Sequence, residues 1–210
     1  MYLLYGMGIS NQSIKRYFDQ NNINYSVYVD QKGVSFPSLD KVSLVVKSPG
    51  IKNDTPFLAY CKEFKVQIVS DIELFYLLNR PKYIIAVSGS NGKTTVTSIL
   101  GKLLEEEGFL TVGNIGIPVF DYINKEEGKF IVECSSYMLE YTFMFKPNIY
   151  VLLNIEKHHL DHHHTFSNYI KAKLKPLKNM TSNDFVVYSR DDVLLNRLLC
   201  GYSSKKNTYS

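Results

Sequence analysis

The sequence predicts an α/β protein built around largely parallel sheets. Short apolar runs alternate with amphipathic stretches along all 210 residues, the order expected when strands and helices follow one another in a parallel sheet. Hydrophobic residues make up 45% and charged residues 21% of the chain, close to globular averages, which excludes a disordered or fibrous protein. Two glycine-containing turns, at residues 6–8 and 89–92, each follow an apolar run and precede an amphipathic one. They mark two consecutive α/β units.

The first unit is expected to contain four strands. These are Tyr2–Tyr5, Tyr25–Val29, Val42–Val46 and Val66–Val69. Asp71 is expected to cap a helix that ends at Asn79, and Arg80-Pro81 then breaks the chain. We therefore place a domain boundary near residue 80, between a Rossmann-like domain at 1–80 and a P-loop domain with a mainly parallel sheet at 81–210.

The second unit restarts the order of strand, glycine turn and helix. Its strands are expected at Tyr83–Val87, Phe130–Cys134, Ile149–Leu153 and Phe185–Tyr188. One helix is expected over Thr94–Glu107, with Gly108 at its C-terminal cap. Another is expected over Ser167–Lys178, where Pro176 shortens it.

Charge and cysteine content exclude several classes of protein. The net charge of +4 is spread along the chain, so it is no nucleic-acid-binding footprint, and most lysines are interpreted as solvated surface. Cys61, Cys134 and Cys200 lack metal-ligand spacing, which indicates reduced thiols. The sequence has no basic leader and no apolar run of about 18 residues, so we expect a cytoplasmic monomer without a membrane partner.

The segment Gly89-Ser90-Asn91-Gly92-Lys93-Thr94-Thr95 has the chemistry of a phosphate-binding loop. It follows an apolar strand and opens a helix, so its backbone N–H groups converge where the helix dipole favours an anion. Lys93 supplies a positive charge for the β- and γ-phosphates of ATP, and the Thr94 hydroxyl is placed to bind Mg²⁺. The strict motif has glycine where this chain has Val87, so a plain glycine turn beside an incidental lysine is the alternative.

The segment Gly6-Met7-Gly8-Ile9-Ser10-Asn11 is similar to a dinucleotide-binding fingerprint. Asp30 follows the second strand, where such domains carry an acid that binds ribose. Asn11 replaces the third glycine of the fingerprint. On these residues alone, NAD binding and a plain turn without a ligand are both open.

Four further segments, taken with the phosphate loop, resemble the Mur ligases. They are Asn114-Ile115-Gly116-Ile117-Pro118, Glu133–Glu140, Asn154–His162 and Tyr169–Lys173. Ser48-Pro49-Gly50-Ile51 and Asp71-Ile72-Glu73-Leu74-Phe75 resemble the members that add D-glutamate to UDP-N-acetylmuramoyl-L-alanine. The resemblance covers essentially the whole chain, and the joint occurrence of the segments is far more specific than any one of them.

This resemblance implies a ligase that depends on ATP and Mg²⁺. ATP would phosphorylate the carboxylate of UDP-N-acetylmuramoyl-L-alanine, and the amine of D-glutamate would attack the acyl phosphate to form an amide. Carboxylate and triphosphate repel one another, so Mg²⁺ and the Lys93 charge must neutralise their encounter. The implied partners are these two substrates, with no nucleic acid.

The resemblance also implies roles for particular residues. Glu133 is implied to bind Mg²⁺, with a purely structural carboxylate as the alternative. Asn114 and Ser135 are implied to contact the substrate, although a loop asparagine is often only a turn residue. His159 is implied to lie near a second Mg²⁺, and Lys173 to carry a carbamate that binds this ion. The alternative for Lys173 is a lysine that faces solvent.

In the same interpretation, the first domain binds the UDP part of the substrate instead of NAD. The candidate contacts are Gly8, Ser10, Asn11, Asp30, Lys32, Ser48 and Gly50. Mur ligases have three domains, so the chain is expected to stop partway through the central one and to lack the D-glutamate-binding domain. We expect the 210-residue chain alone to form no amide bond. The competing functions are a non-catalytic UDP-sugar- and ATP-binding fragment and another P-loop phosphotransferase.

All five histidines fall within residues 158–164. His158 and His162, or His159 and His163, would share a face in a helix, and imidazoles suit transition-metal ions. In the ligase interpretation, only His159 belongs to the active site and the other four are incidental surface residues. The family normally has an acid where this chain has His158.

Overall fold

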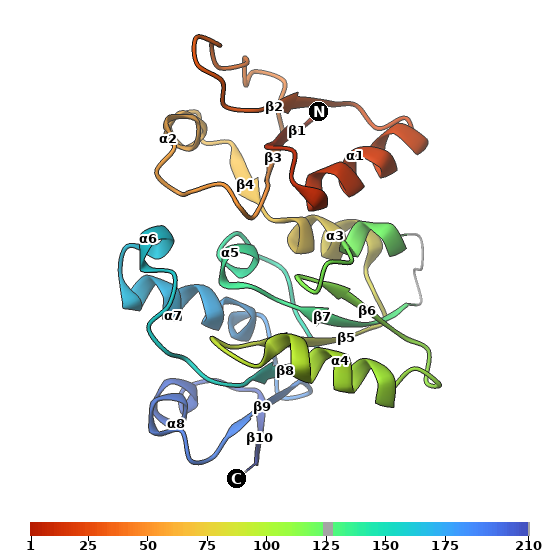
Figure 1. Ribbon diagram of the computed structural model, residues 1–210, viewed down its shortest axis with the longest axis vertical. Coiled ribbons are helices and arrows are strands. Elements are labelled where there is room, and N and C mark those ends of the chain that lie inside the picture. Colours follow the sequence, from red (N-terminus) through yellow and green to blue (C-terminus); the bar gives the residue numbers. More distant parts are fainter. Residues whose placement is uncertain (124–127, 210) are drawn as a thin grey trace.

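The computed structural model describes residues 1–123 and 128–209, which form two parallel sheets with helices packed on them (Figure 1). The first sheet has the strand order β2-β1-β3-β4, and the second has the order β10-β9-β8-β5-β7-β6. All strand pairs in both sheets are parallel. The predicted α/β class with mainly parallel sheets is confirmed.

The first sheet and its helices occupy the N-terminal part of the chain. Their bounds are β1 Tyr2–Tyr5, α1 Ile9–Gln20, β2 Tyr25–Tyr28, β3 Leu44–Lys47, α2 Pro56–Glu63, β4 Gln67–Val69 and α3 Asp71–Asn79. Strand β1 lies between β2 and β3, with Tyr2 opposite both Tyr25 and Leu44. Because the strand order reverses here, the loops after β1 and β3 meet at the carboxyl edge where such sheets bind ligands.

The second sheet is larger, and β5 lies at its centre. The bounds are β5 Tyr83–Ser88, α4 Lys93–Leu103, β6 Phe109–Gly113, η1 Val119–Tyr122, β7 Lys129–Glu133, α5 Ser136–Leu139, β8 Ile149–Leu152, α6 Leu160–His163, α7 Phe166–Leu174, η2 Lys175–Lys178, β9 Phe185–Ser189, α8 Val193–Leu199 and β10 Lys205–Tyr209. Strands β7 and β8 flank β5. The loop after β5 therefore lies beside the ends of both neighbours.

Two expected helix ends are wrong. Ser70 caps α3, because its hydroxyl accepts a hydrogen bond from the Glu73 backbone N–H, and Asp71 is the first residue inside the helix. Helix α4 starts at Lys93 and ends at Leu103 instead of Glu107. Three consecutive glutamates at positions 105–107 would crowd negative charge at the negative end of the helix dipole, which favours this earlier end.

The expected proline effect is confirmed, because α7 stops at Leu174 and Pro176 lies in the short 3-10 helix that follows. The thiols match the expectation as well. Cys61 and Cys134 are buried, Cys200 is exposed, and all three are free. In the portion of the chain that the structure describes, no helix has the length and apolar character needed to cross a membrane.

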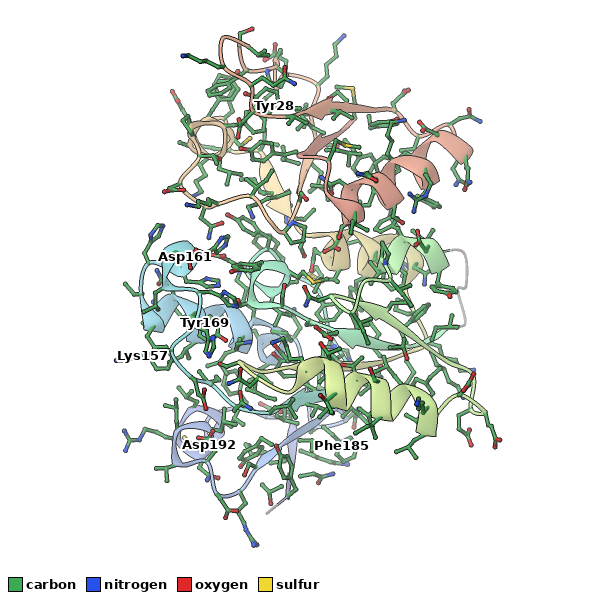
Figure 2. All side chains as sticks on the ribbon, in the orientation of Figure 1. Tyr28, Lys157, Asp161, Tyr169, Phe185 and Asp192 are labelled. Atoms are coloured by element: carbon green, nitrogen blue, oxygen red, sulfur yellow. The ribbon has the colours of Figure 1, made fainter. Side chains whose placement is uncertain are left out.

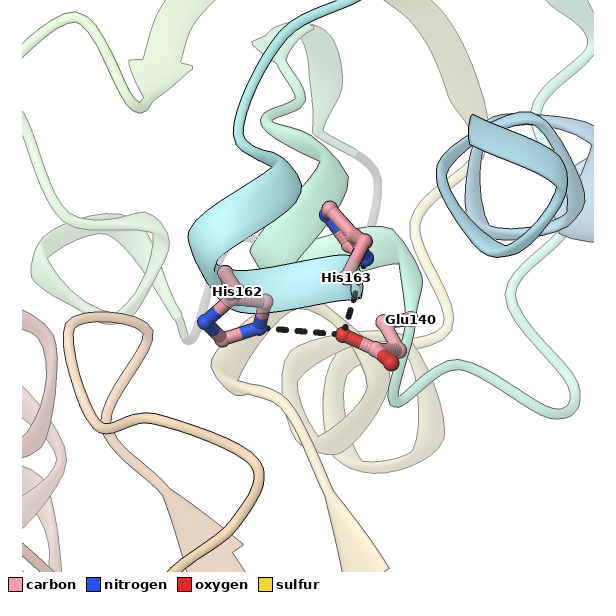
Figure 3. A group of neighbouring side chains, drawn as sticks. All are labelled: Glu140, His162 and His163. Atoms are coloured by element: carbon pink, nitrogen blue, oxygen red, sulfur yellow. Dashed lines mark hydrogen bonds and ion pairs between the residues drawn. The ribbon is translucent and has the colours of Figure 1, made fainter. Parts of the chain in front are cut away.

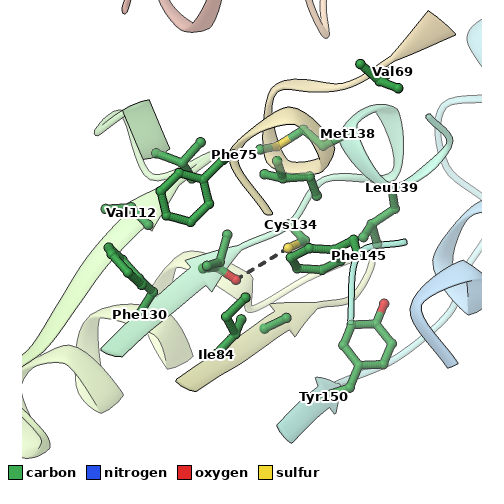
Figure 4. Packing of buried hydrophobic residues seen from close by; sticks show 14 of the residues in the cluster. Val69, Phe75, Ile84, Val112, Phe130, Cys134, Met138, Leu139, Phe145 and Tyr150 are labelled. Carbon is green, nitrogen blue, oxygen red and sulfur yellow. Dashed lines mark hydrogen bonds between the residues drawn. The ribbon is translucent and has the colours of Figure 1, made fainter. Parts of the chain in front are cut away.

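One hydrophobic cluster extends across both sheets and fixes how the two halves meet. Figure 4 shows its centre, where Phe75 from α3 lies near Phe130 of β7, with Cys134 and Phe145 close by. The rings of Phe75 and Phe130 meet edge to face, with centroids 5.1 Å apart. Truncating a buried phenylalanine to alanine typically costs about 3–5 kcal/mol. Helix α3 is thus a shared core element, and it holds the loops of both sheets near one another.

Candidate active site

The phosphate loop joins β5 to α4 and leaves the start of that helix without a side-chain cap. Gly92 has a φ of 81°, a left-handed conformation that favours glycine, and no side chain bonds to the first turn. Asn154 holds the loop from the end of β8. Its backbone carbonyl accepts from the Ser90 N–H at 3.0 Å, and its side-chain oxygen accepts from the Asn91 N–H at 2.9 Å. The N–H groups of the first helical turn are therefore available to an anion.

Lys93 lies over this loop. Its ammonium group donates to the backbone carbonyls of Gly89 at 3.0 Å and Ser90 at 2.9 Å. Burial lowers the pKa of Lys93, and the nearby Glu133 charge opposes that shift. Thr94 and Thr95 are exposed in the first turn of α4. A positive charge, a hydroxyl and free backbone donors thus meet at one helix start, as triphosphate binding requires.

Glu133 ends β7 and supplies a buried carboxylate beside the loop. It lies opposite Val87 in the sheet, and it is only 1% exposed. The Asn114 side-chain amide donates to Glu133 Oε1 at 2.7 Å, whereas Oε2 has no hydrogen-bond partner among the described residues. A buried carboxylate oxygen left unpaired is costly, so a cation is its natural partner. The oxygen donors at this position fit Mg²⁺, which prefers such ligands.

Lys173 reaches the same loop from α7. It is 1% exposed, and its amino group donates to the Gly89 carbonyl at 2.8 Å and to the Ser88 hydroxyl at 3.2 Å. The alternative of a lysine that faces solvent is therefore wrong. Burial, reinforced by the charge of Lys93, lowers the pKa of Lys173 to about 7. A substantial fraction of this amine is consequently neutral near pH 7, and a neutral amine is a nucleophile.

Tyr169 and Ser90 form a contact that sequence reasoning missed. Tyr169, labelled in Figure 2, is buried in α7, and its hydroxyl is hydrogen bonded to Ser90 Oγ at 2.8 Å. The same Ser90 oxygen accepts the Glu156 backbone N–H at 2.8 Å. The sequence feature that could have indicated this contact is the four-residue spacing from Tyr169 to Lys173, which places both side chains on one helical face. Both residues therefore hold α7 against the phosphate loop.

His159 and Ser135 lie at the starts of two short helices. His159 begins α6 with a φ of 53°, and its Nδ1 lies 2.7 Å from the Tyr137 hydroxyl. Burial lowers the pKa of His159, which keeps the imidazole neutral near pH 7. The Ser135 hydroxyl accepts from the Met138 N–H at 3.3 Å and caps α5. In this arrangement the Ser135 hydroxyl is a helix cap.

The expectation for the other histidines is wrong in part. His162 and His163 are 5% and 1% exposed, so they are no surface residues, whereas His164 is exposed. The short helix α6 turns both rings inward toward Glu140. Sequence alone could not reveal this, because the burial depends on how one helical turn packs against α5.

A cavity of about 270 Å³ lies where the two sheets meet, and it contains four of the expected contacts of the first unit. These are Gly8, Ser10, Ser48 and Gly50, with Asn114 on the opposite wall. An added Cβ at Gly8 would lie 2.6 Å from Ser48 Oγ, so a larger residue here would force the Ser48 hydroxyl to move. Helix α1 also begins here with no side-chain cap.

The remaining expected contacts lie elsewhere. The Asn11 side chain is fully buried and donates to the backbone carbonyls of Tyr5, Gly6 and Val46, so it supports the loop and offers no surface to a ligand. Asp30 accepts a hydrogen bond from the Tyr5 hydroxyl and, like Lys32, is exposed outside the cavity.

Known proteins are similar to this chain over most of its length. The family model "Mur ligase middle domain" matches residues 87–210. A UDP-N-acetylmuramoylalanine--D-glutamate ligase from Clostridioides difficile is 38% identical over 164 residues, which are 76% of this chain and 36% of that protein. A protein of the same name from Legionella pneumophila is 32% identical over 92% of this chain and 48% of its own length. The chain thus spans between about a third and a half of these curated relatives.

Solved structures show the same fold. A UDP-N-acetylmuramate:L-alanyl-gamma-D-glutamyl-meso-diaminopimelate ligase from Neisseria meningitides covers 98% of this chain and 76% of its own, with a TM-score of 0.61 and 16% identity. A UDP-N-acetylmuramate-alanine ligase from Thermotoga maritima covers 94% of this chain and 50% of its own, with a TM-score of 0.53 and 22% identity. The phosphate loop, Glu133 and Lys173 all lie within the matched residues 87–210. The chain therefore belongs to the Mur ligase family.

Proposed function

We propose that this chain provides the nucleotide- and substrate-binding part of a ligase that joins D-glutamate to UDP-N-acetylmuramoyl-L-alanine. The single observation that carries the proposal is the buried Glu133 carboxylate, whose free oxygen lies in a site with the Lys93 loop and the buried Lys173 amine. A general P-loop protein has no need for a buried second lysine beside its loop. Relatives at 32–41% identity carry the name of this ligase, which supports the same substrates.

Two parts of the chain divide the work in this proposal. Residues 1–80 bind the UDP end of the substrate at the loops after β1 and β3, and residues 81–210 bind ATP at the loop after β5. The cavity that joins Ser48 to Asn114 supports this division, because a long substrate could reach from one sheet to the other along it. The carboxylate of the L-alanine would then approach the nucleotide site.

ATP binding in the proposal uses groups of the chain together with Mg²⁺. The first-turn N–H groups of α4 hold the phosphate oxygens, and Lys93 exchanges its two loop carbonyls for the β- and γ-phosphates. Thr94 and Glu133 would hold Mg²⁺, which supplies the charge that lets a carboxylate approach a triphosphate. The carboxylate oxygen attacks the γ-phosphorus, and the bond to the ADP oxygen breaks. The acyl phosphate then accepts the D-glutamate amine, and inorganic phosphate leaves.

Lys173 takes part as a carbamate. Its neutral amine attacks carbon dioxide, a nitrogen–carbon bond forms, and one proton is released. The reaction replaces the uncharged amine with an anion, which the Lys93 charge attracts. The new carboxylate oxygens, together with His159, would hold a second Mg²⁺.

Trapping the acyl phosphate tests the proposal. We expect the chain, supplied with Mg-ATP, UDP-N-acetylmuramoyl-L-alanine and hydroxylamine, to release ADP and phosphate and to form one hydroxamate on the L-alanine carboxylate. Mass spectrometry of the nucleotide sugar measures the product. Glu133→Gln keeps an oxygen for the Asn114 amide but removes the charge, so hydroxamate formation should fall sharply in this variant.

Three results would contradict parts of the proposal. ATP cleavage with no hydroxamate would favour another phosphotransferase. Tight binding of both ligands with no cleavage would favour the non-catalytic fragment. Saturable binding of NADH, with no response to UDP-N-acetylmuramoyl-L-alanine, would overturn the assignment of the first sheet.

A further inference from the structure

The side chains of Glu140, His162 and His163 lie close together. Glu140 follows α5, and the two histidines end α6 (Figure 3). Glu140 Oε2 lies 3.1 Å from His162 Nε2 and 3.5 Å from His163 Nδ1. One ligand atom from each residue lies within 4.8 Å of the other two. The Lys175 ammonium donates to the Glu140 backbone carbonyl and not to its carboxylate.

His163 has a nitrogen that the protein itself leaves unpaired. The residue is 1% exposed, its Nε2 lies 2.9 Å from Ser136 Oγ, and its Nδ1 has no hydrogen-bond partner in the described part of the chain. Leaving a buried polar atom unpaired costs about 1–3 kcal/mol. In the tautomer whose Nε2–H donates to Ser136 Oγ, the Nδ1 lone pair faces a Glu140 carboxylate oxygen 3.5 Å away, an arrangement that a cation between the two would stabilise.

The surroundings hold the three side chains in place, as outer partners do around a bound metal ion. Asn53 donates to Glu140 Oε2 at 2.7 Å, and the Tyr141 hydroxyl donates to Asn53 Oδ1 at 2.9 Å. The Tyr137 ring lies edge-on to His162 and parallel to His163, with centroids 4.4 and 5.8 Å away. Neither imidazole is therefore free to turn away from the carboxylate.

The spacing and chemistry select the kind of ion. Four tetrahedral ligands at about 2.0–2.2 Å from zinc lie roughly 3.3–3.6 Å from one another. Glu140 Oε2 lies 3.1 Å from His162 Nε2, slightly below that range, and 3.5 Å from His163 Nδ1, within it. Two imidazoles and one carboxylate suit Zn²⁺ and similar transition-metal ions, whereas Mg²⁺ prefers oxygen ligands throughout. We propose that Glu140, His162 and His163 bind one transition-metal ion of the zinc class, at a site distinct from the magnesium site of the phosphate loop.

Such an ion would act on the active site through α6. His159 directly precedes this helix, which carries two of the three ligands, so a bound ion would tie the helix to the end of α5. Asn53 belongs to the first unit and touches the same carboxylate. Binding would therefore stabilise the fold by mass action and restrain the segment that positions His159.

Cobalt is the probe of choice, because Co²⁺ in a tetrahedral nitrogen and oxygen site has visible absorption. The metal-free chain is titrated with CoCl₂ in the presence of excess Mg²⁺. We expect one equivalent to bind with a tetrahedral spectrum, ZnCl₂ to displace it, and ZnCl₂ to raise the melting temperature. His162→Gln should weaken Co²⁺ binding by more than the roughly 10- to 100-fold that loss of an outer partner causes.

The control variants are His164→Asn and His158→Gln, because both histidines lie outside the cluster. They should bind Co²⁺ as the unaltered chain does. Glu140→Gln provides a second ligand variant, with circular dichroism as the check that it has folded. The proposal is overturned if the unaltered chain gives no tetrahedral spectrum, if folded His162→Gln and Glu140→Gln keep full affinity, or if His158→Gln alone abolishes binding.

Discussion

The two glycine loops that open the two sheets share one geometry and differ in charge. Each follows a first strand, and each leads into a helix without a side-chain cap, at Gly8 for α1 and at Gly92 for α4. The loop after β1 faces a cavity lined by small uncharged residues such as Ser48. The loop after β5 carries Lys93 and lies beside the buried Glu133.

The two loops have one backbone feature in common, a helix start without a side-chain cap. Bare helix starts offer N–H donors to an anion in both places. A triphosphate and Mg²⁺ also need fixed charges, which the second loop has and the first lacks. Elsewhere, the hydroxyls of Thr55, Ser70 and Thr165 cap α2, α3 and α7. The starts of α1 and α4 lack such a hydroxyl cap, so their first N–H groups remain available to a ligand.

Replacing the charge in the second loop should have the largest effect. Lys93→Ala removes the loop's positive charge, so we expect Mg-ATP affinity to fall by one to two powers of ten, which corresponds to the roughly 1.5–3 kcal/mol of a hydrogen bond to a charged group. Calorimetric titration measures it. Affinity for UDP-N-acetylmuramoyl-L-alanine should stay unchanged, and Lys102→Ala, an exposed change in the same helix, is the control. Equal losses for both ligands would remove the distinction between the loops.

A steric change in the first loop should have the second-largest effect. Gly8→Ala places a Cβ 2.6 Å from Ser48 Oγ, and we expect this overpacking to destabilise the chain by about 1–3 kcal/mol and to weaken UDP-substrate binding but not ATP binding. Gly50→Ala is the matched control, since its added Cβ meets nothing within 4 Å. Denaturant unfolding reports stability. The close packing of this loop would be unimportant if both variants unfolded alike.

The carbamate on Lys173 should depend on pH in a defined direction. The pKa of about 7 means that the neutral, reactive amine becomes the major form as pH rises past 7. Between about pH 6 and pH 8 its fraction rises roughly tenfold, whereas an ordinary lysine stays protonated throughout. Carbon-13 NMR with labelled bicarbonate should show one carbamate signal that grows over this range. Lys173→Met should abolish the signal, and Lys171→Met, an exposed neighbour, should keep it.

Removing a helix cap should have the smallest effect. Ser70→Ala deletes the hydroxyl that accepts the Glu73 N–H, so stability should fall by about 1 kcal/mol. Neither ligand should bind differently, because α3 does not open onto a glycine loop. Thermal unfolding together with both titrations checks this. A change in ATP affinity would show that the capped and uncapped helices are not separate in function.

Local spacing was enough to predict the fold class, most of the core strands and the glycine loop between β5 and α4. A strand, a glycine turn and a lysine at the start of a helix are neighbours in sequence, so their geometry follows from the chain itself. The sequence analysis did not predict strands β6 and β10. Strand β10, Lys205–Tyr209, is exposed throughout and is held by backbone pairing to β9, which leaves no apolar period in its sequence.

Tertiary packing decided which of several chemically similar side chains are buried beside the candidate active site. Lys171, Lys173 and Lys175 share one helical segment, yet Lys173 alone among them is buried against Gly89, because only its position on α7 faces β5. His162 and His163 are buried for the same kind of reason, since α6 folds onto Glu140 across 22 residues of chain. Sequence determines which residues can carry charge or bind metal. Burial and unpaired oxygens or nitrogens arise only when distant segments meet, and these decide where the chemistry takes place.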